Sequence, residues 1–197
     1  MPKIVDHDAQ RLKFAEAAMR LIAGKGIEAV TMRAVAREAG LSYGSLFHYF
    51  DSKDDLLMHA VRHLTSQQTA RVNEYEGKYT GLTALEHLLC DDAVVSASSR
   101  DSWTVWLTFQ YKVALDETFA EMHTEMIGGW LDRIRGMLRQ AVRAGELAED
   151  LDVESEAMAL WAFSSGVGQL GLLHPDSLPP SLQKQLITGY LDRLRAA

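Results

Sequence analysis

The chain has 197 residues, of which 47% are hydrophobic and 24% are charged. This length is sufficient to bury a core, and the charged fraction is too low for a disordered chain. Apolar runs all fall short of the ~20 residues that a membrane-spanning helix needs, and residues 1–6 lack a signal-peptide pattern. The single cysteine, Cys90, excludes an internal disulfide. We therefore expect a cytoplasmic globular protein of one or two domains, without a membrane partner, metal or cofactor.

The charge is distributed unevenly along the chain. The formal net charge is −7, yet residues 1–53 carry eight Lys and Arg against six Asp and Glu, hence +2. The remaining residues hold 12 basic and 21 acidic side chains, hence −9. Binding to phosphates needs local positive charge, whereas an acidic remainder limits nonspecific adhesion to polyanions. Residues 1–53 are therefore the part of the chain suited to nucleic acid.

The chain predicts helices from end to end. Apolar residues recur at helical spacing, Ser and Thr residues stand at positions typical of N-caps, and Gly and Pro separate the segments. No persistent two-residue alternation suggests a sheet. The expected helices are one that carries Phe14–Ile22 and ends at Gly24–Gly26, one from Thr31 to Ala39 that ends at Gly40, one from Ser42 to about Phe50, one that starts at Ser52, and five over about 82–97, 101–115, 117–144, 152–173 and 180–195.

Residues 31–50, TMRAVAREAGLSYGSLFHYF, form the most informative segment. They predict a short helix, a turn that contains glycine, and a second short helix. Leu46 and Phe50 are expected to face inward, which leaves an aromatic and hydrogen-bonding surface suited to a DNA groove. Gly44 costs a helix about 1 kcal/mol relative to alanine, so it indicates either close approach by another molecule or a tight turn.

Residues 31–56 resemble the signature of the TetR family. The shared pattern is Thr-x-Arg, a small apolar helix, Ala-Gly-x-Ser-x-Gly-Ser-Leu, an aromatic-His-Tyr-Phe run, and a lysine before a leucine. The resemblance implies an all-α fold, with a three-helix helix-turn-helix DNA-binding domain over residues 1–53 and a helical ligand-binding and dimerisation domain over residues 54–197. It implies a transcriptional regulator, expected to be a repressor, that binds a palindromic operator as a homodimer and is released by a small-molecule effector.

The DNA contacts that the family implies fall on ten residues. Phe47 departs from the pattern, because the family usually places a tyrosine there, and we expect it to pack against a sugar or a thymine methyl instead. For His48 the alternative to a DNA contact is an ordinary surface position, and for Tyr49 the alternative is a place in the core. The implied contacts are Thr31 and Arg33 to phosphates, Ser42, Tyr43, Gly44 and Ser45 in the major groove, Phe47, then His48 and Tyr49 to phosphate oxygens, and Lys53 at the next helix N-terminus.

The second half of the chain is rich in aromatic residues and methionine, which together favour a ligand cavity. Parts of it resemble the C-terminal domain of choline-responsive BetI-type repressors. For each residue singly, ordinary helix-packing core is the alternative; for the chain as a whole, the alternative is a helical enzyme or carrier, although no catalytic constellation appears. The candidate ligand-binding residues are Trp103, Trp106, Phe109, Gln110, Met122, Met126, Trp130 and Trp161.

The last two predicted helices offer small and apolar faces. A palindromic operator read by one helix per subunit requires a dimer, so we expect these faces to form a four-helix dimer interface, with core inside one chain as the alternative. The candidate interface residues are Leu160, Ser164, Val167, Gly168, Gly171, Leu186, Tyr190 and Leu194.

Two further patterns are interpreted as chance matches to known binding motifs. Gly166–Gly171, GVGQLG, matches the dinucleotide-binding fingerprint in letters, but it lies in a predicted helix and lacks the strand that the fingerprint requires. His59 and His63 stand four residues apart, a spacing that suits a metal, but no further ligands follow nearby.

Overall fold

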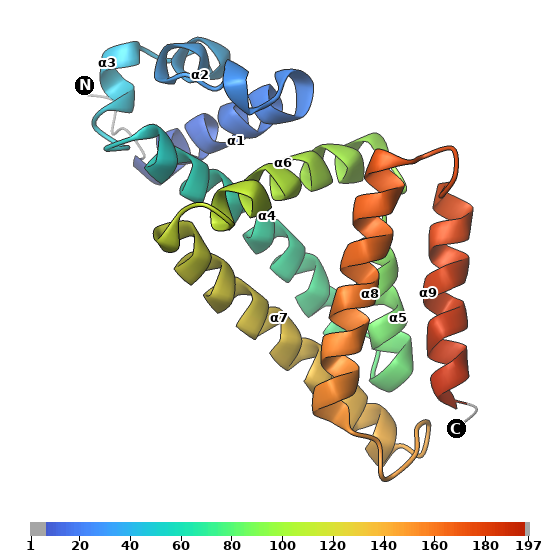
Figure 1. Ribbon diagram of the computed structural model, residues 1–197. Coiled ribbons are helices and arrows are strands. Elements are labelled where there is room, and N and C mark those ends of the chain that lie inside the picture. The colour runs from blue at the N-terminus through green and yellow to red at the C-terminus, as the bar shows by residue number, and fades with distance from the viewer. Residues whose placement is uncertain (1–6, 196–197) are drawn as a thin grey trace.

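The computed structural model describes residues 7–195 (Figure 1). Residues 1–6, on which the expectation of no signal peptide rests, and residues 196–197 lie outside the described range. Within it the chain is helical and contains no strand, in agreement with the predicted all-α fold. The elements are α1 (His7–Lys25), the 3-10 helix η1 (Ile27–Ala29), α2 (Met32–Ala39), α3 (Tyr43–Leu46), α4 (Lys53–Glu76), α5 (Gly81–Asp91), α6 (Ala97–Val113), α7 (Glu117–Arg143), α8 (Val153–Leu173) and α9 (Pro180–Arg195).

Local capping determines where the short N-terminal helices begin and end. The Thr31 hydroxyl accepts a hydrogen bond from the Ala34 amide at 3.1 Å, which satisfies one of the free donors in the first turn of α2. Gly40 ends α2 in the left-handed conformation, with φ of 68°, where a side chain would be strained. The Ser42 hydroxyl caps α3 by accepting from the Ser45 amide at 3.0 Å. These caps confirm the predicted helix starts.

Two predicted helix ends are wrong. The α3 helix ends at Leu46 rather than near Phe50, and residues 47–49 form a turn in which the Phe50 amide donates to the Leu46 carbonyl at 3.1 Å. The helix expected to reach residue 97 ends at Asp91. A capping box at Ser96 starts α6 instead, because the Ser96 and Ser99 side chains each accept from the other's backbone amide.

The core of the N-terminal helices continues onto the rest of the molecule. Phe14 of α1 and Phe50 are fully buried, and they belong to the same hydrophobic cluster as Leu57 of α4, Val105 of α6 and Phe119 of α7. Figure 1 shows α1 lying across α4 and α6. The packing is therefore continuous from α1–α3 to α4, α6 and α7.

A second cluster holds α5, α7, α8 and α9 together at the other end of the molecule. Gln183 of α9 is buried within this end and accepts a hydrogen bond from the Val94 amide at 2.8 Å. Its side-chain amide donates to the Val94 and Leu178 carbonyls at 3.3 and 2.9 Å. Because a buried polar group must find partners, this glutamine fixes the α5–α6 connector to α9.

The α8 residues predicted for the dimer face are buried within the chain, which is the alternative that the sequence left open. A side chain at Gly168 would collide with the Trp103 indole, and one at Gly171 would collide with Gln183, so both glycines serve close packing inside one chain. The same buried face carries the other small and apolar residues of the predicted stripe. The residues of this stripe, all buried within the chain, are Leu160, Ser164, Val167, Gly168 and Gly171.

Exposed positions of α8 and α9 carry several large apolar side chains among polar ones. Of the α9 residues predicted for the interface, Leu186 is exposed, whereas Leu194 is half-buried against the second cluster. Tyr190 is also half-buried, and its hydroxyl donates to the Glu156 carboxylate at 2.9 Å. Burial and this hydrogen bond raise the pKa of Tyr190 to about 12. The exposed large apolar side chains on the two helices are Met158, Leu170, Leu173 and Leu186.

Across residues 7–195, no helix combines the length and the apolar character that crossing a bilayer requires.

Candidate nucleic-acid interface and cavity

The outer face of α3 carries exposed aromatic side chains. Tyr43 and Phe47 are 42% and 50% exposed, although large aromatic rings are normally buried. Their rings pack edge to face with centroids 5.0 Å apart, and the Arg33 guanidinium lies over the Tyr43 ring at 5.4 Å. This arrangement keeps the rings and one positive charge on the same surface. Figure 1 places α3 at the end of the molecule farthest from α9.

Buried residues of the same segment hold that surface in place. Leu46 and Phe50 are almost fully buried, and the Phe50 ring packs edge to face against Phe14 of α1 with centroids 6.1 Å apart. The alternation of buried and exposed positions agrees with the predicted inward pair. Because the inward side is anchored in the core, the outward side chains are presented on a rigid support.

Gly44 has open space beside it. A methyl group at this position would meet no atom within 4 Å, and its backbone needs no positive φ. The fold therefore does not require a glycine here, and of the two sequence interpretations, close approach by another molecule is the one that remains. Ser45, one residue further, is half-buried, and its hydroxyl donates to the Ser42 carbonyl at 2.7 Å.

The remaining predicted contact residues divide into exposed and half-buried groups. Thr31 and His48 are exposed, as a phosphate contact requires. Tyr49 is half-buried, and its ring packs against Phe14 with centroids 5.8 Å apart. The Lys53 ammonium is half-buried as well and donates to the Ile27 carbonyl at 3.3 Å. Of the sequence-predicted residues, Arg33, Tyr43 and Phe47 thus come together on one surface, whereas Tyr49 and Lys53 have contacts within the chain.

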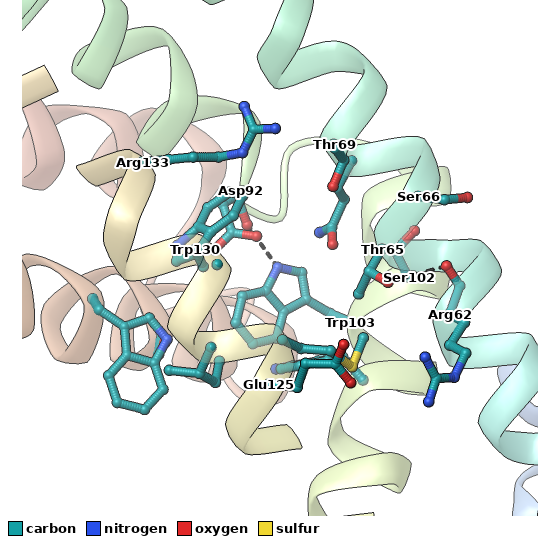
Figure 2. Close-up of a pocket in the computed structure, with 17 residues that line it drawn as sticks. Arg62, Thr65, Ser66, Thr69, Asp92, Ser102, Trp103, Glu125, Trp130 and Arg133 are labelled. Atoms are coloured by element: carbon teal, nitrogen blue, oxygen red, sulfur yellow. Dashed lines mark hydrogen bonds between the residues drawn. The ribbon is translucent and has the colours of Figure 1, made fainter. Parts of the chain in front are cut away.

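A cavity of about 560 Å³ lies between α4, α6, α7 and α8 (Figure 2). All four tryptophans of the protein line it: Trp103 and Trp106 from α6, Trp130 from α7 and Trp161 from α8. A volume of this order holds a small organic molecule, and an aromatic lining with a few polar groups is typical of a ligand site.

Three of the eight predicted ligand residues do not line this cavity. Phe109 and Met122 are buried in the first hydrophobic cluster, where their faces of α6 and α7 meet α1 and α4. Gln110 lies outside the lining as well. Alternate faces of α6 thus serve the core and the cavity, a division that composition alone does not reveal. The predicted residues that line the cavity are Trp103, Trp106, Met126, Trp130 and Trp161.

The polar wall of the cavity was missed by the sequence prediction. Half of its residues come from α4, the helix that follows residues 31–50, and the others come from α6, α7, α8 and the α5–α6 connector. The available signal is an unbroken polar run, Thr65–Thr69, in the middle of a long helix that elsewhere carries core residues. The polar and charged residues in question are Arg62, Thr65, Ser66, Gln68, Thr69, Asp92, Ser102, Glu125, Arg133 and Ser165.

The tryptophan wall is held from two sides. The Trp103 indole N–H donates to the Asp92 backbone carbonyl at 2.6 Å, and the ring packs against Gly168 of α8. Burial raises the pKa of the Asp92 carboxyl to about 7; the neighbouring Asp91 carboxylate adds to the rise, and Arg71 opposes it. Arg133 is neutralised by the Glu76 carboxylate, 2.6 Å from its guanidinium.

The two patterns interpreted as chance have ordinary structural surroundings. Gly166–Gly171 form part of helix α8 rather than a loop after a strand. His59 pairs with Asp55 at 3.3 Å, and His63 makes a hydrogen bond with Gln67 at 2.9 Å. Within residues 7–195 no cluster of three or more His, Cys, Asp or Glu side chains has a geometry that suits a metal ion.

Comparisons with protein families agree with this geometry. Residues 15–60 match the model of bacterial regulatory proteins of the tetR family, and residues 81–196 match that of the C-terminal domain of BetI-type transcriptional repressors. The chain is 26% identical to the HTH-type transcriptional regulator PksA of Bacillus subtilis, over 98% of this chain and 94% of that protein. It is 30% identical to the probable HTH-type transcriptional regulator ArpR of Pseudomonas putida, over 94% and 91%.

Solved structures share the fold. A putative transcriptional regulator from Saccharomonospora viridis in complex with choline superposes with a TM-score of 0.85 at 22% identity, over 94% of this chain and 96% of that one. The regulator FadR of Bacillus subtilis in complex with stearoyl-CoA superposes with a TM-score of 0.77 at 18% identity, over 91% and 96%. These two related structures hold ligands of very different size.

Proposed function

Because the chain belongs to the TetR family of transcriptional regulators, we propose that it is a repressor that binds a palindromic operator as a homodimer and is released when a small organic cation enters the four-tryptophan cavity. It would act on DNA in the cytoplasm. The observation that carries the proposal is the exposed face of α3, where Tyr43 and Phe47 stand outside the core on a buried support.

The exposed face of α3, which we call the recognition face, has the features of a surface that reads the major groove of DNA. Tyr43 and Ser42 offer hydroxyls for base edges or phosphates, and the open space at Gly44 lets the sugar-phosphate backbone approach closely. Arg33 adds positive charge beside them. We assign to Thr31 and His48 the phosphate contacts that fix the register on the duplex.

The dimer follows from the operator and from the surface of α8 and α9. Two recognition helices of one dimer read half-sites about 34–36 Å apart, or a multiple of that distance. The apolar side chains left exposed on α8 and α9, Met158, Leu170, Leu173 and Leu186, supply a contact surface that a second copy of the chain would cover. This outer surface replaces the buried stripe that the sequence favoured.

An organic cation is the effector class that the cavity supports best. The faces of tryptophan rings attract cations, and four such rings meet here beside the carboxyl groups of Asp92 and Glu125. The related regulator from Saccharomonospora viridis holds choline, which is an organic cation. Because α4 both lines the cavity and follows the recognition segment directly, a ligand that displaces α4 moves α3 as well.

Selection of duplex DNA by the purified protein tests the proposal. Several rounds of selection from a random pool, followed by fluorescence anisotropy at two salt concentrations, are expected to enrich a palindrome whose affinity falls steeply as the salt concentration rises. No enrichment at low salt from a folded dimer would contradict the DNA-binding function. Monomeric protein bound to a non-palindromic site would contradict the homodimer.

A further inference from the structure

We propose that Asp92 is the counter-charge of the effector's cationic group and that it releases a proton when the effector binds, so that the affinity for the effector rises with pH. This inference rests on the proposed function, because it assumes that the cavity takes an organic cation. It assigns a specificity-determining role to a residue that follows α5 and belongs to none of the three helices that carry the tryptophans.

The position of Asp92 favours this role. Asp92 is partly accessible and lines the cavity together with Trp103 and Trp130 (Figure 2). The Trp103 indole donates to the Asp92 backbone carbonyl, which places this ring next to Asp92. Asp92 and the aromatic rings therefore line the same cavity, and this combination favours an alkylammonium group.

The charges around Asp92 leave it without compensation. The neighbouring Asp91 carboxylate pairs with Arg71 at 2.7 Å, and the Glu76 carboxylate pairs with Arg133 at 2.6 Å. Within residues 7–195, no basic side chain forms an ion pair with Asp92. Arg62 lies across the cavity on α4. An unpaired carboxylate in such surroundings is costly, so the group holds its proton when the cavity is empty.

A bound cation reverses this balance. The protonated Asp92 carboxyl and the cation combine to give an ion pair, and the proton passes to the solvent buffer, so that the charge balances. Because burial raises the pKa of Asp92 to about 7, the proton is given up within the physiological range. Affinity for a cation is then expected to rise about tenfold between about pH 6 and about pH 8, and little above that.

Other titratable groups at the cavity do not give the same behaviour. His123 of α7 packs against Trp106 with ring centroids 5.7 Å apart, and burial lowers its pKa, which favours the neutral ring. Glu125 lines the cavity on α7 and is the second acidic group that a cation meets. Glu125→Gln is therefore the matched control for Asp92→Asn.

Tryptophan fluorescence reports binding directly, because every tryptophan of the protein lines the cavity. The probes are tetramethylammonium, choline and benzyltrimethylammonium, with 3,3-dimethylbutan-1-ol as the uncharged counterpart of choline. Each is titrated into the wild-type protein, Asp92→Asn and Glu125→Gln at about pH 6 and about pH 8. Calorimetry in two buffers of different ionisation enthalpy measures the protons released.

The expected result is tighter binding of at least one cationic probe at the higher pH, with release of close to one proton near pH 6. Asp92→Asn is expected to bind that probe weakly and without pH dependence, Glu125→Gln to keep the pH dependence, and the uncharged alcohol to show none. Equal binding of the cation by wild type and Asp92→Asn, with the same pH dependence, would overturn this inference and leave the proposed effector class intact. Failure of every cationic probe to bind wild type would overturn both.

Discussion

The recognition face and the cavity are built in different ways. The recognition face comes from one continuous stretch, residues 31–50, in which side-chain caps and buried anchors lie within a few positions of each other. The cavity is assembled from four helices and a connector between residues 62 and 165. A face encoded locally can be predicted from its own residues. A cavity depends on which side of each helix turns toward it, and that is decided by long-range packing.

The largest expected effect concerns the recognition face. Replacement of both Arg33 and Tyr43 by alanine is expected to lower operator affinity about 100-fold or more, because contacts of this kind contribute about 1–3 kcal/mol each. Anisotropy on the selected operator at fixed salt measures it. Tyr111→Ala removes a tyrosine that is 64% exposed on α6 and serves as the matched control. Unchanged affinity of the double variant would remove α3 from the interface.

A smaller effect is expected at the wall of the cavity. Gly168→Ala places a methyl group against the Trp103 ring, so the free energy of unfolding is expected to fall by up to about 3 kcal/mol through overpacking, and tryptophan fluorescence to change. Gly136→Ala on α7 meets open space and is expected to raise stability by about 0.5–1 kcal/mol. Chemical denaturation measures both. Equal effects of the two substitutions would show that Gly168 does not position Trp103.

The next effect is the pH dependence that Asp92 gives to stability. Its folded pKa of about 7 lies above its ordinary value of 3.8, so the folded protein binds the proton more tightly than the unfolded chain does. Stability is therefore lost as the pH rises from about 4 to about 7, and the loss is complete above the folded pKa. Asp92→Asn removes this loss.

Denaturation of wild type and Asp92→Asn at several pH values measures it. The two proteins are expected to be similarly stable near pH 4, and the variant to be about 2 kcal/mol more stable near pH 8, after allowance for solvent in the cavity. A constant difference between the two proteins across this range would mean that Asp92 is not buried as an uncompensated acid.

The smallest expected effect concerns the connection between the two regions. The Lys112 ammonium of α6 pairs with the Asp54 carboxylate in the first turn of α4 at 2.8 Å. Both side chains are partly exposed, so Lys112→Met is expected to lower stability by less than about 1 kcal/mol. The loss of operator affinity that the effector causes is expected to shrink about two- to threefold, because α6 then holds α4 less firmly. An unchanged effector response would exclude this pair from the coupling.

Particular residues explain what the sequence could predict. Thr31, Gly40 and Ser42 control helix boundaries through their own side chains or backbone, so the helix-turn-helix follows from local chemistry. Gly168 and Gly171 were assigned to a dimer face because small residues permit close approach. The same property lets Trp103 and Gln183 pack on them inside one chain, and the sequence does not distinguish the two kinds of approach.

The sequence predicted the aromatic wall of the cavity but not its polar wall. A group of tryptophans is unusual in composition and therefore indicates a cavity. The polar run of α4 resembles an ordinary solvent-exposed helix face, and only the positions of α6 and α7 show that it lines the cavity. The role of Asp92 could not be predicted from the sequence for the same reason, since it lies next to another aspartate at the end of a helix. Its position beside Trp103 depends on how α5 and α6 are connected and on the attachment of that connector to Gln183.

Release of the operator by a cation tests the central claim most directly. The complex of the protein with the selected operator is titrated at about pH 8 with the cationic probe that binds best, while DNA anisotropy and tryptophan fluorescence are recorded together. The proposed function predicts that the anisotropy falls over the same probe concentrations at which the fluorescence changes, since both report one linked equilibrium. Saturation of the fluorescence change with the anisotropy unaltered would contradict it, because the cavity would then bind a ligand that has no effect on DNA binding.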